Sequence, residues 1–207
     1  MESTCTERCA GDTSIEASPL LRALTGSAWI QTSYWRDSET LFTHALAVTT
    51  NNDVAQNDLG TVFLQKGELD QAIAHYKEAV AIKPESAEIQ YNLGNALARK
   101  GHWADAIASY QAALSTERDS VKAAKVRNNL GAALERLGKS DEALEQFSQA
   151  LRINESYPEA HCNLGRMLAQ RGRRDEAVAH FREALRLKPG YEEARRQLRE
   201  LGVPVGQ

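Results

Sequence analysis

Residues 59–84 read LGTVFLQKGELDQAIAHYKEAVAIKP, and the pattern in this stretch decides the fold. A Leu-Gly pair ending at Gly60 is followed by a second glycine at Gly67, then by Ala72 and an aromatic residue, Tyr76. The same features return in the same order after three further Leu-Gly pairs, which end at Gly94, Gly131 and Gly165. A unit that recurs at nearly constant intervals along the chain is typical of a solenoid, in which each unit packs on its neighbours.

Each unit is expected to be a pair of helices. Within residues 53–86, apolar residues recur at helical spacing on both sides of Gly67 and do not alternate as they would in a strand. Gly67 stands where the C-terminus of a helix favours a residue that tolerates positive φ. Asp70 is expected to cap the second helix, and Pro84 to end it. The predicted unit is therefore helix, tight turn, helix and short loop.

This unit resembles the tetratricopeptide repeat. The residues that carry the resemblance in the first clear copy are Gln56, Leu59, Gly60, Phe63, Ala72, Tyr76 and Pro84. The resemblance covers about residues 19–201. It implies an all-α solenoid, a right-handed superhelix of antiparallel helix pairs with a C-terminal capping helix, and it implies a non-catalytic scaffold that binds a peptide or a partner protein.

The register of the Leu-Gly pairs divides the chain into segments. They are a disordered leader at 1–18, a degenerate first repeat at 19–52, repeats at 53–86, 87–123, 124–157 and 158–190, and a capping helix with a tail at 191–207. The interval from Gly94 to Gly131 is 37 residues, whereas the intervals on either side of it are 34. Three residues are therefore inserted near 120–122, and either the helix or the loop before it is longer.

In tetratricopeptide arrays the first helix of each pair lines a concave groove, so the resemblance implies which residues face a ligand. The expected groove residues are Asn57, Asp58, Tyr91, Asn92, Asn95, Arg99, Lys125, Asn128, Asn129, Arg136, Asn163 and Arg166. Three of them, Asn92, Asn129 and Asn163, stand two residues before their glycines. A carboxamide offers a donor and an acceptor, so such a row could grip the backbone of an extended peptide. The alternative is that these asparagines are simply polar residues of the groove or satisfy the neighbouring helix.

Two further resemblances lead to an alternative function. The asparagine row is similar to one in the repeat region of O-linked N-acetylglucosamine transferases, although Asp58 takes its first place. Residues 31–49 resemble the junction before the repeats in certain membrane proteins of the glycosyltransferase type. Both resemblances imply an accessory domain that presents substrate to a glycosyltransferase.

A dicarboxylate clamp, which captures the C-terminus of a partner, is a rival binding mode. Asn92 and Lys125 fit their places in the clamp. Asn57, Thr61 and Asn129 stand where a lysine, an asparagine and a basic residue are expected. We therefore reject the clamp.

The sequence offers no catalytic, cofactor or metal motif. Gly138-Lys139-Ser140 is similar to the end of a phosphate-binding loop, but Ala133 replaces the required glycine and no strand precedes it. Three cysteines form no disulfide framework, and Cys5 and Cys9 have no nearby histidine to complete a zinc site. We predict that the protein is not an enzyme and that it needs no cofactor.

The expected partner is a protein or an extended peptide. A net charge of -3 is too small to indicate nucleic acid. No membrane span or signal peptide is visible, so we expect a cytoplasmic protein, or an extracytoplasmic one if it is the repeat part of a membrane glycosyltransferase-like protein. Trp29, Ile30 and Tyr34 in the degenerate repeat could support self-association. Trp35 and Trp103 share one repeat position, and we interpret them as packing residues.

Overall fold

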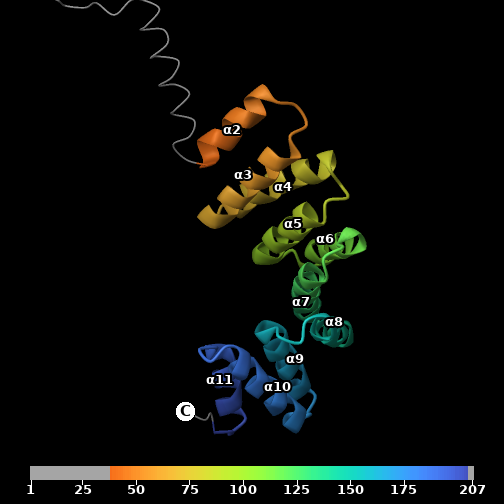
Figure 1. Ribbon diagram of the computed structural model, residues 1–207, viewed down its shortest axis with the longest axis vertical. Helices are drawn as coiled ribbons and strands as arrows, with labels where there is room; N and C mark the ends of the chain where they lie inside the picture. Colours follow the sequence, from red (N-terminus) through yellow and green to blue (C-terminus); the bar gives the residue numbers. More distant parts are fainter. Residues whose placement is uncertain (1–37, 205–207) are drawn as a thin grey trace, which may run out of the picture. The chain divides into compact units, whose positions relative to one another are not determined.

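The computed structural model describes residues 38–204, which form ten helices and no strand (Figure 1). The helices are α2 (Ser38–Val48), α3 (Asp53–Lys66), α4 (Leu69–Ile82), α5 (Ala87–Lys100), α6 (Trp103–Thr116), α7 (Ser120–Arg136), α8 (Ser140–Ile153), α9 (Pro158–Gln170), α10 (Arg174–Leu187) and α11 (Glu192–Glu200). The chain divides after Leu41 into two units, and α3 to α11 all lie in the larger one. The predicted leader, Trp35 and the proposed self-association surface lie outside the described residues.

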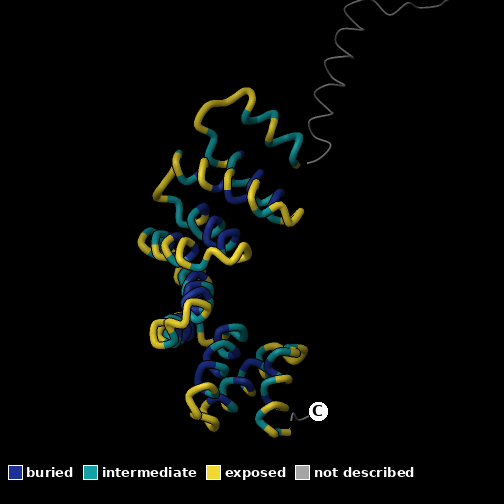
Figure 2. The backbone as a smooth tube through the Cα atoms, turned by 180° about the vertical axis from the view of Figure 1, so that it is seen from behind, coloured by how far each residue is buried: buried dark blue, intermediate teal, exposed yellow. Residues whose placement is uncertain are grey.

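Four helix pairs follow one another in the larger unit: α3–α4, α5–α6, α7–α8 and α9–α10. We call α3, α5, α7 and α9 the first helices and their partners the second helices. Each second helix contacts the first helix of the next pair, and α11 packs on α10 and α9. Buried residues accumulate where consecutive helices face one another (Figure 2). The predicted all-α solenoid of helix pairs with a closing C-terminal helix is confirmed.

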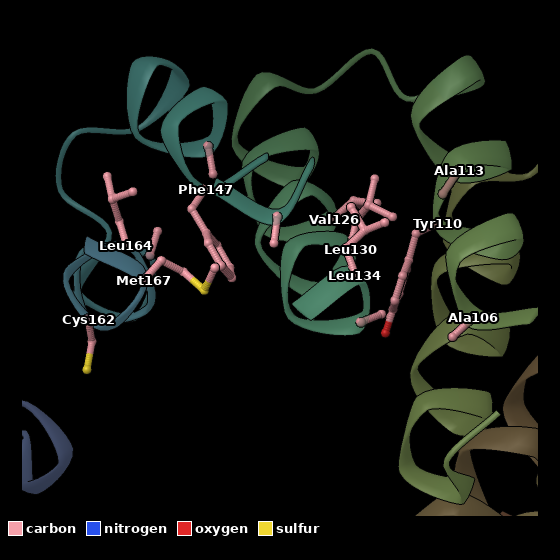
Figure 3. Packing of buried hydrophobic residues seen from close by; sticks show 14 of the residues in the cluster. Ala106, Tyr110, Ala113, Val126, Leu130, Leu134, Phe147, Cys162, Leu164 and Met167 are labelled. Carbon is pink, nitrogen blue, oxygen red and sulfur yellow. The ribbon is translucent and has the colours of Figure 1, made fainter. Parts of the chain in front are cut away.

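A glycine opposite an aromatic ring sets the close approach within each pair. A Cβ atom built on Gly94 would lie 2.6 Å from Cε1 of Tyr110, and the equivalent contacts in the other three pairs are 2.7–2.9 Å. Tyr110 is only 2% exposed, and its ring faces Leu130 and Leu134 of the next pair (Figure 3). The same ring therefore packs within its own pair and between pairs, which is why the Leu-Gly and aromatic positions recur together.

The turn within a pair is shorter than the sequence suggested. Gly67 ends α3 with φ 83°, as predicted, and the backbone N–H of Glu68 donates to Phe63. Glu68 is the N-cap of α4, so the prediction that Asp70 caps this helix is wrong. The glycine reverses the chain so tightly that α4 begins at Leu69. Asp70 lies within the first turn and pairs with Lys100 of the next first helix.

The three-residue insertion lengthens a helix. Helix α7 has 17 residues, whereas α3 and α5 have 14 each. Its extra turn begins at Ser120, and the side chain of Asp119 caps it by accepting hydrogen bonds from the backbone N–H groups of Val121 and Lys122. Only residues 117–119 separate α6 from α7, so the preceding loop has not grown.

A side-chain clasp joins the two helices of three of the pairs at one repeat position. Gln56 contacts His75 at 2.7 Å, Arg127 donates to Gln146 at 2.9 Å, and His161 contacts His180 at 2.9 Å. The last of these clasps brings the Nδ1 atoms of two histidines together. Burial and the neighbouring His161 lower the pKa of His180, which favours the neutral form of His180 in this clasp.

Candidate functional site

The first helices form the inner side of the array. Contacts join α3 to α5, α5 to α7 and α7 to α9. Within the described part of the chain, no comparable contact joins one second helix to another. The first helices of successive pairs therefore lie closer together than the second helices, and their solvent-facing side is the inner face. All twelve expected groove residues lie on these four helices.

Asparagines connect successive first helices in a repeating way. Asn92 on α5 donates from Nδ2 to Oδ1 of Asn57 on α3, over 2.9 Å. Asn163 on α9 donates in the same way to Asn128 on α7, also over 2.9 Å. Asn128 is only 6% exposed, so its carboxamide is a buried polar group that needs these partners. The two contacts share one geometry.

Between these two contacts the pattern changes. Tyr91 stands on α5 where Asn57 and Asn128 stand on their helices, so its hydroxyl replaces a carboxamide. Asn129 donates from Nδ2 to the hydroxyl of Tyr91 at 3.1 Å and to Oδ1 of Asn95 at 2.9 Å. The hydroxyl of Tyr110 also donates to Asn95, at 2.9 Å. Burial and the neighbouring Tyr91 raise the pKa of Tyr110, so it stays a neutral donor.

The carboxamides of Asn92, Asn129 and Asn163 are oriented by the protein itself. We call these three residues the carboxamide row. The side-chain nitrogen of each donates a hydrogen bond to a residue on the preceding first helix. The oxygen of Asn163 accepts from Arg166 at 3.2 Å, whereas that of Asn92 accepts no hydrogen bond from any described residue. The row thus satisfies its neighbours and still has hydrogen-bonding capacity left for a ligand.

Two pockets lie near the N-terminal ends of the first helices, one between α3 and α5 and the other between α5 and α7. Asn57 and Asp58 line one of about 200 Å³ together with Asp53, Lys83 and Glu88. The equivalent pocket one repeat later, of about 260 Å³, is lined by Tyr91, Asn92, Glu88, Glu117, Lys122 and Lys125. Lys122 belongs to the extra turn of α7, so the insertion supplies one wall.

Tyr157 lies two repeats after Ser86, at the repeat position that Ser86 occupies in the first of these pockets. It is half-buried and packs against the core. Burial and the nearby Tyr91 raise the pKa of Tyr157 to about 12, so it too remains neutral.

The expected arginines have three different environments. Arg99 donates from Nη1 to the backbone oxygen of Leu64 near the end of α3, over 3.0 Å. The guanidinium of Arg136 lies 5.8 Å from the centre of the Trp103 ring. Arg166 forms an ion pair with Glu135. Arg99 and Arg136 are exposed, and Arg166 is partly buried.

A third pocket, of about 350 Å³, lies between α5, α6 and α7. Its lining includes the expected residues Asn95, Arg99 and Asn129, and it adds Ala98, Trp103 and Ala132. The sequence alone did not identify these last three as site residues. Trp103 packs against the core, as its position predicts, but it also forms a wall of this pocket. The sequence does contain one indication of this pocket: Ala132 is smaller than Thr61, Asn95 and Arg166, which stand at the same repeat position.

Across the described residues, no group of three or more histidine, cysteine or acidic side chains is placed to hold a metal ion. No helix among residues 38–204 is both long enough and apolar enough to cross a membrane. Neither observation tests the predicted absence of enzymatic activity, which stays a prediction.

Comparison with known families finds repeat models along most of the described chain. A TPR repeat model matches residues 60–101, and two tetratricopeptide repeat models match residues 85–156 and 128–192. No curated protein matches the sequence. The similarity to glycosyltransferase-associated repeats therefore stays a prediction.

Solved structures with a similar fold include MamA and a subunit of a larger assembly. A MamA crystal structure has a TM-score of 0.64 at 26% identity, over 76% of this chain and 87% of that one. MamA from Desulfovibrio magneticus RS-1, residues 41 to the end, has a TM-score of 0.66 at 16% identity, over 85% and 97%. The APC/C hetero-tetramer Cut9–Hcn1 contributes a chain with a TM-score of 0.70 at 21% identity, over 84% and 34%. The last two likenesses concern the fold alone.

Proposed function

Because residues 60–192 carry tetratricopeptide repeats, we propose that the chain is a non-catalytic scaffold that binds an extended segment of a partner protein along its inner face. The observation that carries the proposal is the carboxamide row. Its three members stand in register on successive first helices, and each is held by a hydrogen bond to the preceding helix. Side chains fixed before binding lose little conformational entropy when a ligand arrives.

The spacing of the row suits an extended chain. Packed helices lie about 8–10 Å apart, and an extended chain advances about 3.3 Å per residue, so roughly three ligand residues correspond to one repeat. Contact through the ligand backbone leaves its sequence largely free, and the pockets beside the row would then provide selectivity. Asn57, Asp58, Tyr91 and Lys125 would contribute through the pockets that they line, whereas the buried Asn128 would act by holding Asn163 in place.

The experiment is a selection of binding peptides followed by a matched comparison of variants. A display library of random peptides of about 12 residues, long enough to span the row, is selected on the intact protein. Affinities of the selected peptides are then measured for the wild type and for the triple variant Asn92→Ala, Asn129→Ala, Asn163→Ala. The control replaces three carboxamides on second helices, Gln71→Ala, Gln111→Ala and Gln149→Ala.

We expect the row variant to lose roughly tenfold or more in affinity and the control to lose little. Far-ultraviolet circular dichroism must show that both variants keep their helices, because the row also joins first helices. Equal affinities for the two variants would contradict binding along the inner face.

The alternative, an accessory domain that presents substrate to a glycosyltransferase, uses the same row. The asparagines on successive first helices favour it, since they are similar to the row in O-linked N-acetylglucosamine transferases. The two functions differ in the partner rather than in the surface. A membrane glycosyltransferase encoded beside this chain would favour the accessory function, and its absence would favour a general scaffold.

A further inference from the structure

The pocket between α5, α6 and α7 arises from a gap between two alanines. Ala98 on α5 and Ala132 on α7 stand at fixed repeat positions, four residues and one residue after their glycines. At the same two positions, α7 and α9 carry Glu135 and Arg166, which form an ion pair across the interval. Between α5 and α7 these two positions hold only alanines, and a pocket of about 350 Å³ is found there.

The indole of Trp103 gives the pocket an aromatic wall. At this repeat position the other second helices carry Leu69, Ser140 and Arg174, so only this one of the four pairs presents a large flat ring. Ala98, Ala132 and Ala133 complete a mostly apolar lining. An enclosed cavity of about 150 Å³ holds a benzene molecule, so this open pocket has room for a large side chain.

The charges around the pocket are positive. Arg99 is the only charged residue in the lining, and Arg136 lies against the indole wall. Both arginines are exposed, so they can reorient towards a ligand. An apolar pocket with one guanidinium group in its lining and a second against its indole wall complements an apolar side chain next to a carboxylate.

We propose that this pocket, which we call the Trp103 pocket, anchors a large apolar or aromatic side chain of the bound segment, beside an aspartate or glutamate that faces Arg99 and Arg136. This inference rests on the proposed function, because the pocket is part of the inner face and Asn95 and Asn129 lie on its rim. The backbone of the segment follows the carboxamide row, and the pocket selects which segment binds.

The test fills the pocket with the larger residues that another interval of the same array has at these two positions. The variant Ala98→Leu, Ala132→Asn gives the interval between α5 and α7 the same pair, Leu64 and Asn95, that stands between α3 and α5. It introduces no charge. The matched control makes the same two changes on the exposed side of α6, as Ala104→Leu, Ala108→Asn.

The probes are the peptides selected on the wild-type protein from the random library. We expect them to share a large apolar residue next to an aspartate or glutamate. We expect the filled-pocket variant to bind them roughly tenfold or more weakly, while the control binds them as the wild type does. A second variant, Arg99→Gln, Arg136→Gln, uses the residue found at Gln65 and Gln170 and keeps the pocket open. It should weaken binding several-fold and reduce its dependence on salt.

The outcomes separate this inference from the proposed function. Peptides that bind the filled-pocket variant as tightly as the wild type, yet lose affinity for the row variant, overturn the Trp103 pocket and leave the proposed function standing. If the peptides bind the filled-pocket variant and the row variant as tightly as the wild type, or if the selection yields no peptide, both the inference and the proposed function are overturned. If the filled-pocket variant does not fold, unchanged affinity and salt dependence in the arginine variant overturn the inference instead.

Discussion

Asn163 donates a hydrogen bond of 2.9 Å from its side-chain nitrogen to the side-chain oxygen of Asn128 on the preceding first helix. The same bond joins Asn92 to Asn57 two helix pairs earlier in the array. The asparagines that are candidates for gripping a ligand therefore also join one repeat to the next. Removing them should reduce stability and, if the proposed function is right, also binding, and the two effects can be measured separately.

Replacing Asn128 should cost more stability than replacing Asn57. Asn128→Ala removes a nearly buried acceptor and leaves the carboxamide nitrogen of Asn163 without this partner, so we expect a loss of about 1–3 kcal/mol in the free energy of unfolding. Asn57→Ala breaks the equivalent bond at a half-buried site and should cost less. Urea unfolding followed by circular dichroism measures both. Equal losses would show that burial does not decide the strength of this contact.

Adding one methyl group at Gly94 should destabilise the protein although alanine is the better helix former. Alanine gains about 1 kcal/mol over glycine inside a helix. Its Cβ would lie 2.6 Å from the buried ring of Tyr110, and overpacking of this kind costs about 1–3 kcal/mol or more. We therefore expect Gly94→Ala to lower the midpoint of thermal unfolding.

The matched control for this substitution is Gly190→Ala, because no atom lies within 4 Å of a Cβ built at that position. Gly190 lies in the turn between α10 and α11, and its substitution should leave the unfolding midpoint nearly unchanged. If Gly94→Ala were as stable as the control, the close approach of α5 and α6 would not depend on the missing side chain.

Removing the hydroxyl of Tyr110 should cost about 1 kcal/mol of unfolding free energy. Tyr110→Phe keeps the ring in place, since Phe147 and Phe181 fill the same position in the next two pairs. It removes the hydrogen bond that the hydroxyl donates to Asn95, which would then accept from Asn129 alone. Chemical denaturation measures the loss, and an unchanged midpoint would mean that this bond contributes nothing.

The protein should lose stability as the pH falls below about 6.5, through the clasp between His161 and His180. Burial first, and then the neighbouring His161, hold the pKa of His180 below its ordinary value of 6.5, while Glu176 acts in the opposite direction. The unfolded chain therefore takes up this proton before the folded chain does. The stability contributed above about pH 6.5 is progressively lost as the pH falls towards the folded-state pKa.

Unfolding midpoints at about pH 7.5 and about pH 5.5, on either side of the ordinary histidine pKa, test this pH dependence. His180→Gln uses the residue that stands at this position as Gln146, and we expect it to show a smaller drop than the wild type. His102→Gln, at an exposed histidine, is the control and should drop as the wild type does. A full drop in His180→Gln would place the pH dependence elsewhere.

The sequence was sufficient to predict the fold because the residues that pack against each other recur at fixed positions in every repeat. Gly94 lacks a side chain where the ring of Tyr110 needs space, and both recur in each copy, so the helix pairs could be predicted before any coordinates. The cap of α4 could not be predicted as well. Asp70 has the right residue type, but the turn at Gly67 needs fewer residues than a typical cap and loop.

The inner face was only partly predictable, for a physical reason. Asn92 and Asn129 were expected to face a ligand, but their bonds to Asn57 and Asn95 depend on how far one helix slides along the next. The Trp103 pocket went unnoticed because it comes from the absence of large side chains, at Ala132 above all. A small residue indicates a pocket only when it is compared with larger residues at the same position of the other repeats.

The most direct test of binding along the inner face is a nuclear magnetic resonance titration of the protein with a selected peptide, observed at the side-chain carboxamide groups. We predict that the NH₂ signals of Asn92, Asn129 and Asn163 shift progressively as the peptide is added, while those of Gln71, Gln111 and Gln149 on the second helices stay in place. The opposite pattern, with shifts at the second-helix glutamines and none along the carboxamide row, would contradict the account.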